Sequence, residues 1–110
     1  MPRVLELTPT DFRRRWPEEN SADVVLLDVR EPQELTLASV RQAIHIPMRE
    51  VPQRQHELDS ARPLVVMCHS GGRSRRVAEF LATNGFEEVY NLAGGIDAWA
   101  QEIDSSVPRY

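Results

Sequence analysis

The chain contains no lysine, since all 13 of its basic residues are arginine. This absence excludes Schiff-base chemistry on a side-chain amine and leaves guanidinium groups for anion recognition. The 17 acidic residues bring the formal net charge to -4, so no global positive field attracts nucleic acid or an anionic membrane. We therefore expect neither as a partner, and a bound anion must be held by a local arrangement of groups.

Cysteine is nearly absent too: Cys68 stands alone and cannot form an intramolecular disulfide. Neither CxxC nor HExxH occurs, and the three histidines are scattered, so no metal site is predicted. No run approaches the roughly 20 apolar residues of a membrane span, and the N-terminus lacks the apolar core of a signal peptide. These absences predict a soluble protein of the reducing cytoplasm.

What is present is a regular alternation of strand and helix patterns, within a length that fits one domain over residues 1–110. Continuous apolar, β-branched runs predict buried strands at 24–29, 43–47, 63–68 and 87–92. Capping signals and periodicity predict helices at 8–16, 31–39, 74–85 and 95–103, two short helices within 48–60, and a C-terminal tail at 105–110. The alternation predicts an α/β fold with a mainly parallel central sheet and helices on both faces.

Cys68 lies at the carboxyl end of the predicted strand 63–68, where open parallel sheets bind their ligands. The chain then turns into a helix through His69, Ser70, Gly71 and Gly72, and the two glycines permit dihedral angles that side chains would forbid. Amide N–H groups that converge at a helix N-terminus stabilise negative charge and lower the pKa of a thiol. Most lone cysteines are small buried hydrophobes, but this loop predicts a nucleophilic thiolate at Cys68.

Arg73 follows Cys68 by five positions and can hold an anionic substrate through its forked donors. Alternatively, Arg73 belongs to a solvent-exposed face of the helix and binds no substrate. We prefer this interpretation for Arg75 and Arg76. Cysteine-dependent phosphatases have the spacing Cys-x5-Arg, which encloses a phosphate. The Cys-x4-Arg spacing found here makes a tighter ring, better matched to one sulfur atom bound to the cysteine.

The stretches "DVREPQEL", "CHSGGRS" and "NLAGGIDAWA" occur in this order and resemble the motifs of single-domain rhodaneses, which are sulfurtransferases of the rhodanese-like superfamily. The resemblance covers the chain from about Val4 to Pro108. It implies that Cys68 takes a sulfane sulfur from a donor such as thiosulfate, forms a persulfide and passes the sulfur to cyanide or a thiol. Amides from His69 to Arg73 would hold the persulfide, the Arg73 side chain would orient the donor, and no metal or organic cofactor is implied.

The resemblance also gives roles to residues outside the loop. Asp28 and Arg30, from the Asp-x-Arg motif, are interpreted as structural support. The C-terminal motif allows a tight turn and packs a helix on the sheet through Gly94, Gly95, Ala98 and Trp99. None of the three histidines is predicted to be essential for catalysis. His69 is at most a minor general base. His45 is interpreted as a structural residue, and His56 as a surface residue.

One segment departs from the family pattern Gly-His-Ile-x-Gly-Ala. Ser39 and Val40 replace the Gly-His pair, and Gln42 replaces the second glycine. This departure affects the approach of the second strand more than it affects the assignment.

Three alternatives to a sulfurtransferase enzyme remain open. A phosphatase or arsenate reductase requires a longer loop, and a non-catalytic interaction module typically lacks the cysteine. A protein-to-protein sulfur relay would need an exposed apolar patch beside Cys68, for which Met48 and Met67 are candidates.

Overall fold

A five-stranded parallel sheet forms the centre of the computed structural model, which describes residues 3–18 and 22–110. The strand order is β1-β5-β4-β2-β3. The strands are β1 (Val4–Leu7), β2 (Val25–Asp28), β3 (Ile44–His45), β4 (Leu64–Met67) and β5 (Val89–Leu92). The predicted α/β fold with a mainly parallel sheet is confirmed.

Among the strands and α-helices of residues 3–18 and 22–110, β1 alone was not predicted from the sequence. It lies at an edge of the sheet and pairs only with β5. Its two middle residues are exposed, whereas β2, β4 and β5 are buried along their whole length. An edge strand of four residues therefore lacks the continuous apolar run by which the buried strands were recognised.

The helices are α1 (Pro9–Arg15), α2 (Pro32–Leu35), α3 (Val51–Arg54), α4 (Gly72–Thr83) and α5 (Gly95–Glu102), with 3-10 turns η1 (Met48–Glu50) and η2 (Gln55–Glu57). Helix α1 begins as predicted, since the Thr8 side chain accepts a hydrogen bond of 3.1 Å from the Asp11 amide and Pro9 follows. Within 48–60, where two short helices were predicted, the chain forms η1, the single short helix α3 and η2 in succession.

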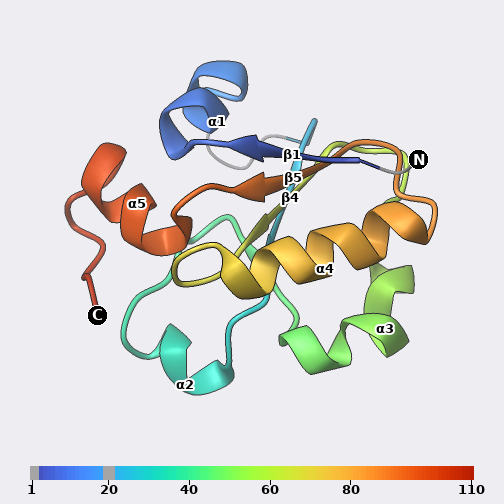
Figure 1. Ribbon diagram of the computed structural model, residues 1–110. Helices are drawn as coiled ribbons and strands as arrows, with labels where there is room; N and C mark the ends of the chain where they lie inside the picture. The colour runs from blue at the N-terminus through green and yellow to red at the C-terminus, as the bar shows by residue number, and fades with distance from the viewer. Residues whose placement is uncertain (1–2, 19–21) are drawn as a thin grey trace.

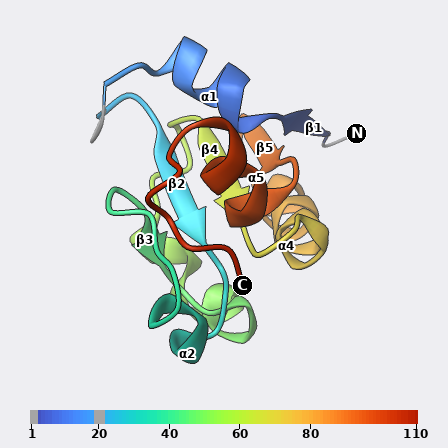
Figure 2. The ribbon, with the colours of Figure 1, turned by 90° about the vertical axis from the view of Figure 1, so that its left-hand side faces the viewer.

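The helices form a layer on each face of the sheet (Figures 1 and 2). On one face α3 and α4 bury a cluster that includes Leu27, Val66 and Leu81. On the other face α1 and α5 bury a second cluster around Phe12 and Trp99. The predicted covering of both faces is therefore confirmed, and the ends of the strands remain for a site.

At the carboxyl edge of the sheet, β2 ends at Asp28 and β4 ends at Met67, while α4 and α5 both begin there. Residues 105–110, predicted as a tail, contain no helix or strand. They nevertheless return to this edge, where Tyr110 contacts residues of α2 and of the Cys68 loop. Within the described part of the chain, no helix is both long and apolar enough to cross a membrane.

Candidate active site

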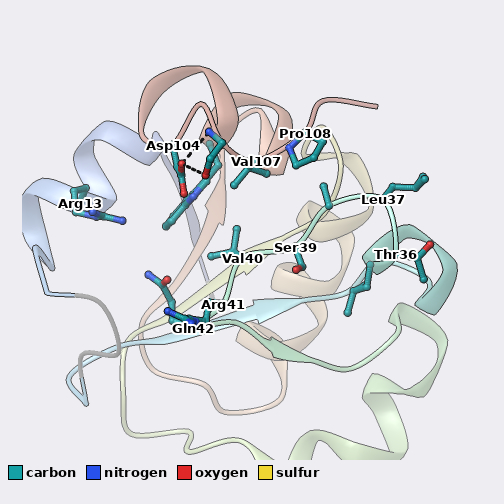
Figure 3. Close-up of a pocket in the computed structure, with 14 residues that line it drawn as sticks. Arg13, Thr36, Leu37, Ser39, Val40, Arg41, Gln42, Asp104, Val107 and Pro108 are labelled. Carbon is teal, nitrogen blue, oxygen red and sulfur yellow. Dashed lines mark hydrogen bonds between the residues drawn. The ribbon is translucent and has the colours of Figure 1, made fainter.

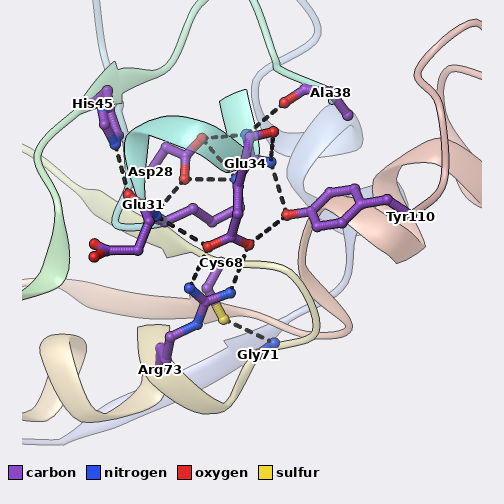
Figure 4. Close-up of polar contacts among 10 residues, drawn as sticks. Asp28, Glu31, Glu34, Ala38, His45, Cys68, Gly71, Arg73 and Tyr110 are labelled. Carbon is purple, nitrogen blue, oxygen red and sulfur yellow. Dashed lines mark hydrogen bonds and ion pairs between the residues drawn. The ribbon is translucent and has the colours of Figure 1, made fainter. Parts of the chain in front are cut away.

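Cys68 directly follows β4 and is only 1% exposed. The loop passes through His69 and Ser70 to Gly71, which precedes α4 with a φ of 113°. This left-handed conformation suits a glycine, and it turns the Gly71 amide back onto the sulfur at 3.1 Å (Figure 4). The predicted curl is present, but only Gly71 needs the freedom of a glycine, since Gly72 is already the first residue of α4.

The surroundings of Cys68 act on its pKa in opposite directions. Burial raises the pKa of the thiol, because a charged sulfur loses solvation. The Ser74 hydroxyl and the amides of Ser74, Gly71 and Ser70 favour the thiolate, and together they outweigh burial. The pKa of Cys68 is therefore lowered, as a nucleophilic role requires.

Helix α5 fixes the outer side of the loop. Its first amides donate to the loop carbonyls, from Ile96 to Cys68 at 2.9 Å and from Asp97 to His69 at 3.1 Å. Because these carbonyls are held outward, the following amides can face the sulfur. Gly95 makes this approach possible: a Cβ there would lie 2.4 Å from the Cys68 carbonyl oxygen, at a φ of 59°. The sequence assigned Gly95 to the fold alone and missed this link to the site.

Two buried polar residues that the sequence analysis did not single out stand behind the loop. The fully buried Ser74 donates its hydroxyl to Asn91 Oδ1, and the Asn91 amide nitrogen donates to the Gly71 carbonyl at 3.1 Å. A hydroxyl carries one proton, so Ser74 can donate to the sulfur only by turning away from Asn91. An asparagine inside the apolar "VYNL" strand was the signal that could have revealed this network.

Arg73 reaches the loop but is already paired. Its two terminal nitrogens donate to Glu34 at 2.6 and 2.9 Å, in a fork that leaves neither carboxylate oxygen free (Figure 4). These bonds, with smaller contributions from the Tyr110 hydroxyl and the Glu31 amide, lower the pKa of Glu34 from 4.5 to about 2. The arginine that the sequence assigned to the substrate therefore binds a carboxylate of the chain itself.

Asp28 and Arg30 form a second ion pair, at 2.7 Å, and both side chains are almost completely buried. Arg30 also donates to the Ala38 carbonyl and the Tyr110 hydroxyl, each at 2.9 Å. The pair therefore ties β2 to the following segment and to the C-terminal residues. This placement agrees with a supporting role beside the site.

The histidines and methionines lie as follows. The His69 ring stacks on Tyr110 with 4.1 Å between ring centroids, and His45 Nε2 lies 2.7 Å from the Arg30 carbonyl. His56 is exposed. Met67 is fully buried and cannot form a docking rim, whereas Met48 is partly buried at the edge of a hollow.

Two hollows flank the carboxyl edge of the sheet. One, of about 350 Å³, adjoins the loop and is lined by Val29, Glu31, Met48, Arg49 and Arg73. A larger one, of about 430 Å³, lies between segment 35–42 and the C-terminal residues (Figure 3). None of the residues 68–73 lines the larger hollow, so the smaller one is the candidate for substrate.

The geometry of the loop agrees with the comparison to known families. The model of the rhodanese-like domain matches residues 8–102. The chain belongs to the rhodanese-like family. This rhodanese-like domain is 38% identical over 74 residues to thiosulfate sulfurtransferase GlpE of Vibrio cholerae, covering 67% of this chain and 70% of that protein.

Two further likenesses extend this result. Rhodanese-like/PpiC domain-containing protein 12, chloroplastic, of Arabidopsis thaliana is 39% identical over 89 residues, which are 77% of this chain but only 30% of that protein. The crystal structure of a rhodanese-related protein from Thermoplasma volcanium superposes with a TM-score of 0.79 at 29% identity. It covers 91% of this chain and 94% of the other.

Proposed function

We propose that this rhodanese-like domain is a sulfurtransferase that carries a sulfane sulfur as a persulfide on Cys68. The observation that carries the proposal is the Cys68 sulfur itself, buried at the end of β4 and bonded by the Gly71 amide at 3.1 Å. An anionic sulfur at this position is stabilised by preorganised dipoles that need not reorient during the reaction. The name of the Vibrio cholerae relative supports thiosulfate as the donor.

In the donor step the Cys68 thiolate attacks the outer sulfur of thiosulfate. A bond forms between Sγ and that sulfur, the sulfur–sulfur bond of thiosulfate breaks, and its electron pair leaves with sulfite. The enzyme then carries a persulfide anion, which the loop amides are placed to stabilise. The short Cys-x4-Arg loop favours this product over a phosphate ester.

In the acceptor step cyanide or a thiol attacks the terminal sulfur. The bond between this sulfur and Sγ breaks, and the electron pair returns to Sγ, which becomes the thiolate again. The leaving thiolate needs the same amides as the first step, so one loop serves both halves of the cycle.

A relay that moves sulfur between proteins is the second candidate function. It is favoured by the pairing of Arg73 with Glu34, because a neutralised guanidinium attracts a small dianion less strongly than a free one. In a relay, the donor would be a protein persulfide instead of thiosulfate.

The test is the intact mass of the protein before and after incubation with thiosulfate, for the wild type and Cys68→Ser. We expect a gain of about 32 Da, one sulfur atom, on the wild type alone, reversed by cyanide or a thiol. A gain on both proteins would place the sulfur elsewhere. If neither gains mass with thiosulfate but the wild type gains it from a protein persulfide, the relay replaces the enzyme.

A further inference from the structure

Two charged side chains beside the Cys68 loop take no part in the sulfur transfer described above. Glu31 and Arg49 both line the hollow of about 350 Å³ that adjoins Arg73. Figure 4 shows the Glu31 carboxylate pointing away from the carboxylate of Glu34. Among the residues that the structure describes, neither Glu31 nor Arg49 forms an ion pair within 4.0 Å, with each other or with another side chain.

The hollow adjoins the Cys68 loop through Arg73 and lies beside the end of β4. The Val29 amide donates to the carbonyl of Met67, the residue before Cys68, at 3.0 Å. The Val29 carbonyl in turn accepts from the Met48 amide at 2.9 Å, which brings η1 and the neighbouring Arg49 to the same edge. The lining of the hollow includes the apolar residues Val29 and Met48, and also the charged residues Glu31 and Arg49.

Arg73, the third charged residue that lines the hollow, adds little net charge to it. Both of its terminal nitrogens are bonded to Glu34, and the two groups neutralise each other. Within the described part of the chain, Arg49 is thus the cation at the hollow without an ion-pair partner, and Glu31, whose side chain belongs to the capping box of α2, is the anion without one. A ligand that matches both carries an anionic and a cationic group, such as the carboxylate and the ammonium of an amino acid.

We propose that the hollow selects a zwitterionic thiol, of the amino-acid type, as the sulfur acceptor. Arg49 binds its carboxylate and Glu31 binds its ammonium group, while its carbon chain lies on Val29 and Met48. This inference rests on the proposed sulfurtransferase function and names the class of acceptor for the same site. Arg49 and Glu31 are specificity-determining residues in this arrangement.

The transfer balances without a further reactant. The sulfur of the acceptor thiol bonds to the terminal sulfur of the Cys68 persulfide, and the bond from that sulfur to Sγ breaks. The electron pair goes to Sγ, which is left as the thiolate, and the proton of the thiol leaves with the new organic persulfide. No outside oxidant or reductant is consumed.

Four small thiols that differ in charge test the proposal: L-cysteine, 3-mercaptopropionate, cysteamine and 2-mercaptoethanol. Protein loaded with thiosulfate and freed of excess donor is mixed with each thiol, and the loss of the persulfide is followed by intact mass. The quantity compared is the ratio of the variant rate constant to the wild-type rate constant for one thiol, because the intrinsic reactivity of that thiol then cancels.

We expect Arg49→Ala to lower the rate constant of transfer to L-cysteine and to 3-mercaptopropionate about fivefold, which is the effect of losing one exposed charge pair. The rate constants for the other two thiols should not change. Glu31→Gln should lower the rate constants for L-cysteine and cysteamine by about the same factor and leave those for the other two thiols unchanged. The matched control is Arg41→Ala, which removes an exposed arginine lining the other hollow and should change none of the four rates.

The proposal is overturned if Arg49→Ala, like Arg41→Ala, changes none of the four rate constants. It is also overturned if Arg49→Ala or Glu31→Gln lowers all four rate constants by the same factor. Such a result, obtained on a protein that forms the persulfide, leaves the sulfurtransferase function intact and removes only the acceptor class. A wild-type protein that never forms the persulfide, from thiosulfate or from a protein persulfide, overturns both.

Discussion

At the scale of single residues, Arg73 shows where sequence reasoning reaches its limit. The position of this arginine near Cys68 could be predicted, since only four loop residues separate the two. Its partner Glu34 could not, because the two residues are 39 positions apart in the sequence and come together only where α2 meets α4 at the sheet edge. The charge that the site offers an anion is thus set by a contact that local patterns do not contain.

Glu34→Gln should lower the KM for thiosulfate about threefold, because the guanidinium charge of Arg73 is then no longer balanced. Initial rates of thiocyanate formation over a range of thiosulfate concentrations measure this change. The control is Glu57→Gln, since Glu57 makes a comparable forked pair with Arg54 outside the site. An unchanged KM in Glu34→Gln would mean that Arg73 takes no part in donor binding.

The same pair should make stability depend on pH. The pKa of Glu34 is about 2 in the folded protein and 4.5 without its partners. A lowered folded-state pKa contributes stability that is fully present above pH 4.5 and lost as the pH falls toward 2.

We therefore expect wild type to exceed Glu34→Gln in free energy of unfolding by about 1–2 kcal/mol at pH 7, allowing for solvent screening, and this advantage to vanish near pH 2. Urea unfolding of both proteins at the two pH values measures it. A constant difference would show that the carboxylate charge of Glu34 is not what stabilises the fold.

At the scale of elements, the strands and helices follow from their own residues, whereas their joint effect on the loop does not. The buried strands β2, β4 and β5 were predicted because each is apolar on both faces. Helix α5 was predicted from the periodicity of "GIDAWAQEI". The hydrogen bonds from its first turn to the carbonyls of Cys68 and His69 depend on how closely α5 approaches the loop. The role of Gly95 in this approach is visible only once the backbone is known.

Gly95→Ala should disrupt sulfur transfer more than it disrupts the fold. The new methyl would meet the backbone of Cys68 and His69 at 2.4 to 2.6 Å, so α5 or the loop must move and the amides lose their aim at the sulfur. We expect transfer to fall about tenfold or more, because misaligned amides lose part of the roughly 100-fold or greater effect that one preorganised donor to an anion can have.

Gly85→Ala is the matched control for that change. Gly85 also has a positive φ, of 96°, but a Cβ there would meet nothing within 4 Å. The Gly85→Ala substitution should lower the free energy of unfolding by about 1 kcal/mol through backbone strain and leave the rate of sulfur transfer unchanged. Equal rates for the two variants in the thiosulfate assay would refute the idea that α5 aligns the loop.

At the scale of the whole molecule, residues from far apart in the chain meet around the loop. The Tyr110 hydroxyl donates to Glu34 at 2.7 Å and accepts from Arg30 at 2.9 Å, while its ring stacks on His69. The sequence predicted only a tail there, since residues 105–110 have no apolar periodicity, and a single aromatic side chain gives no sign of its distant partner. The site is therefore closed by a residue outside the matched family region 8–102.

This closure predicts how readily Cys68 reacts with a small alkylating agent. Burial raises the pKa of Tyr110, opposed by Arg30 and reinforced by Glu34, so the hydroxyl keeps its proton at neutral pH and can go on donating to Glu34. Tyr110→Ala removes both the ring that covers His69 and this hydroxyl, whereas Tyr110→Phe removes only the hydroxyl.

We expect iodoacetamide to alkylate Cys68 about threefold faster in Tyr110→Ala than in wild type, because the loop opens more often, and at nearly the wild-type rate in Tyr110→Phe. The rate is measured from pH 5 to 10, since the plateau reports access to the thiolate and the midpoint reports the pKa of Cys68. A raised plateau with an unchanged midpoint assigns Tyr110 to covering the loop. If the midpoint shifts and the plateau stays constant, Tyr110 acts on the charge of the sulfur and covers nothing.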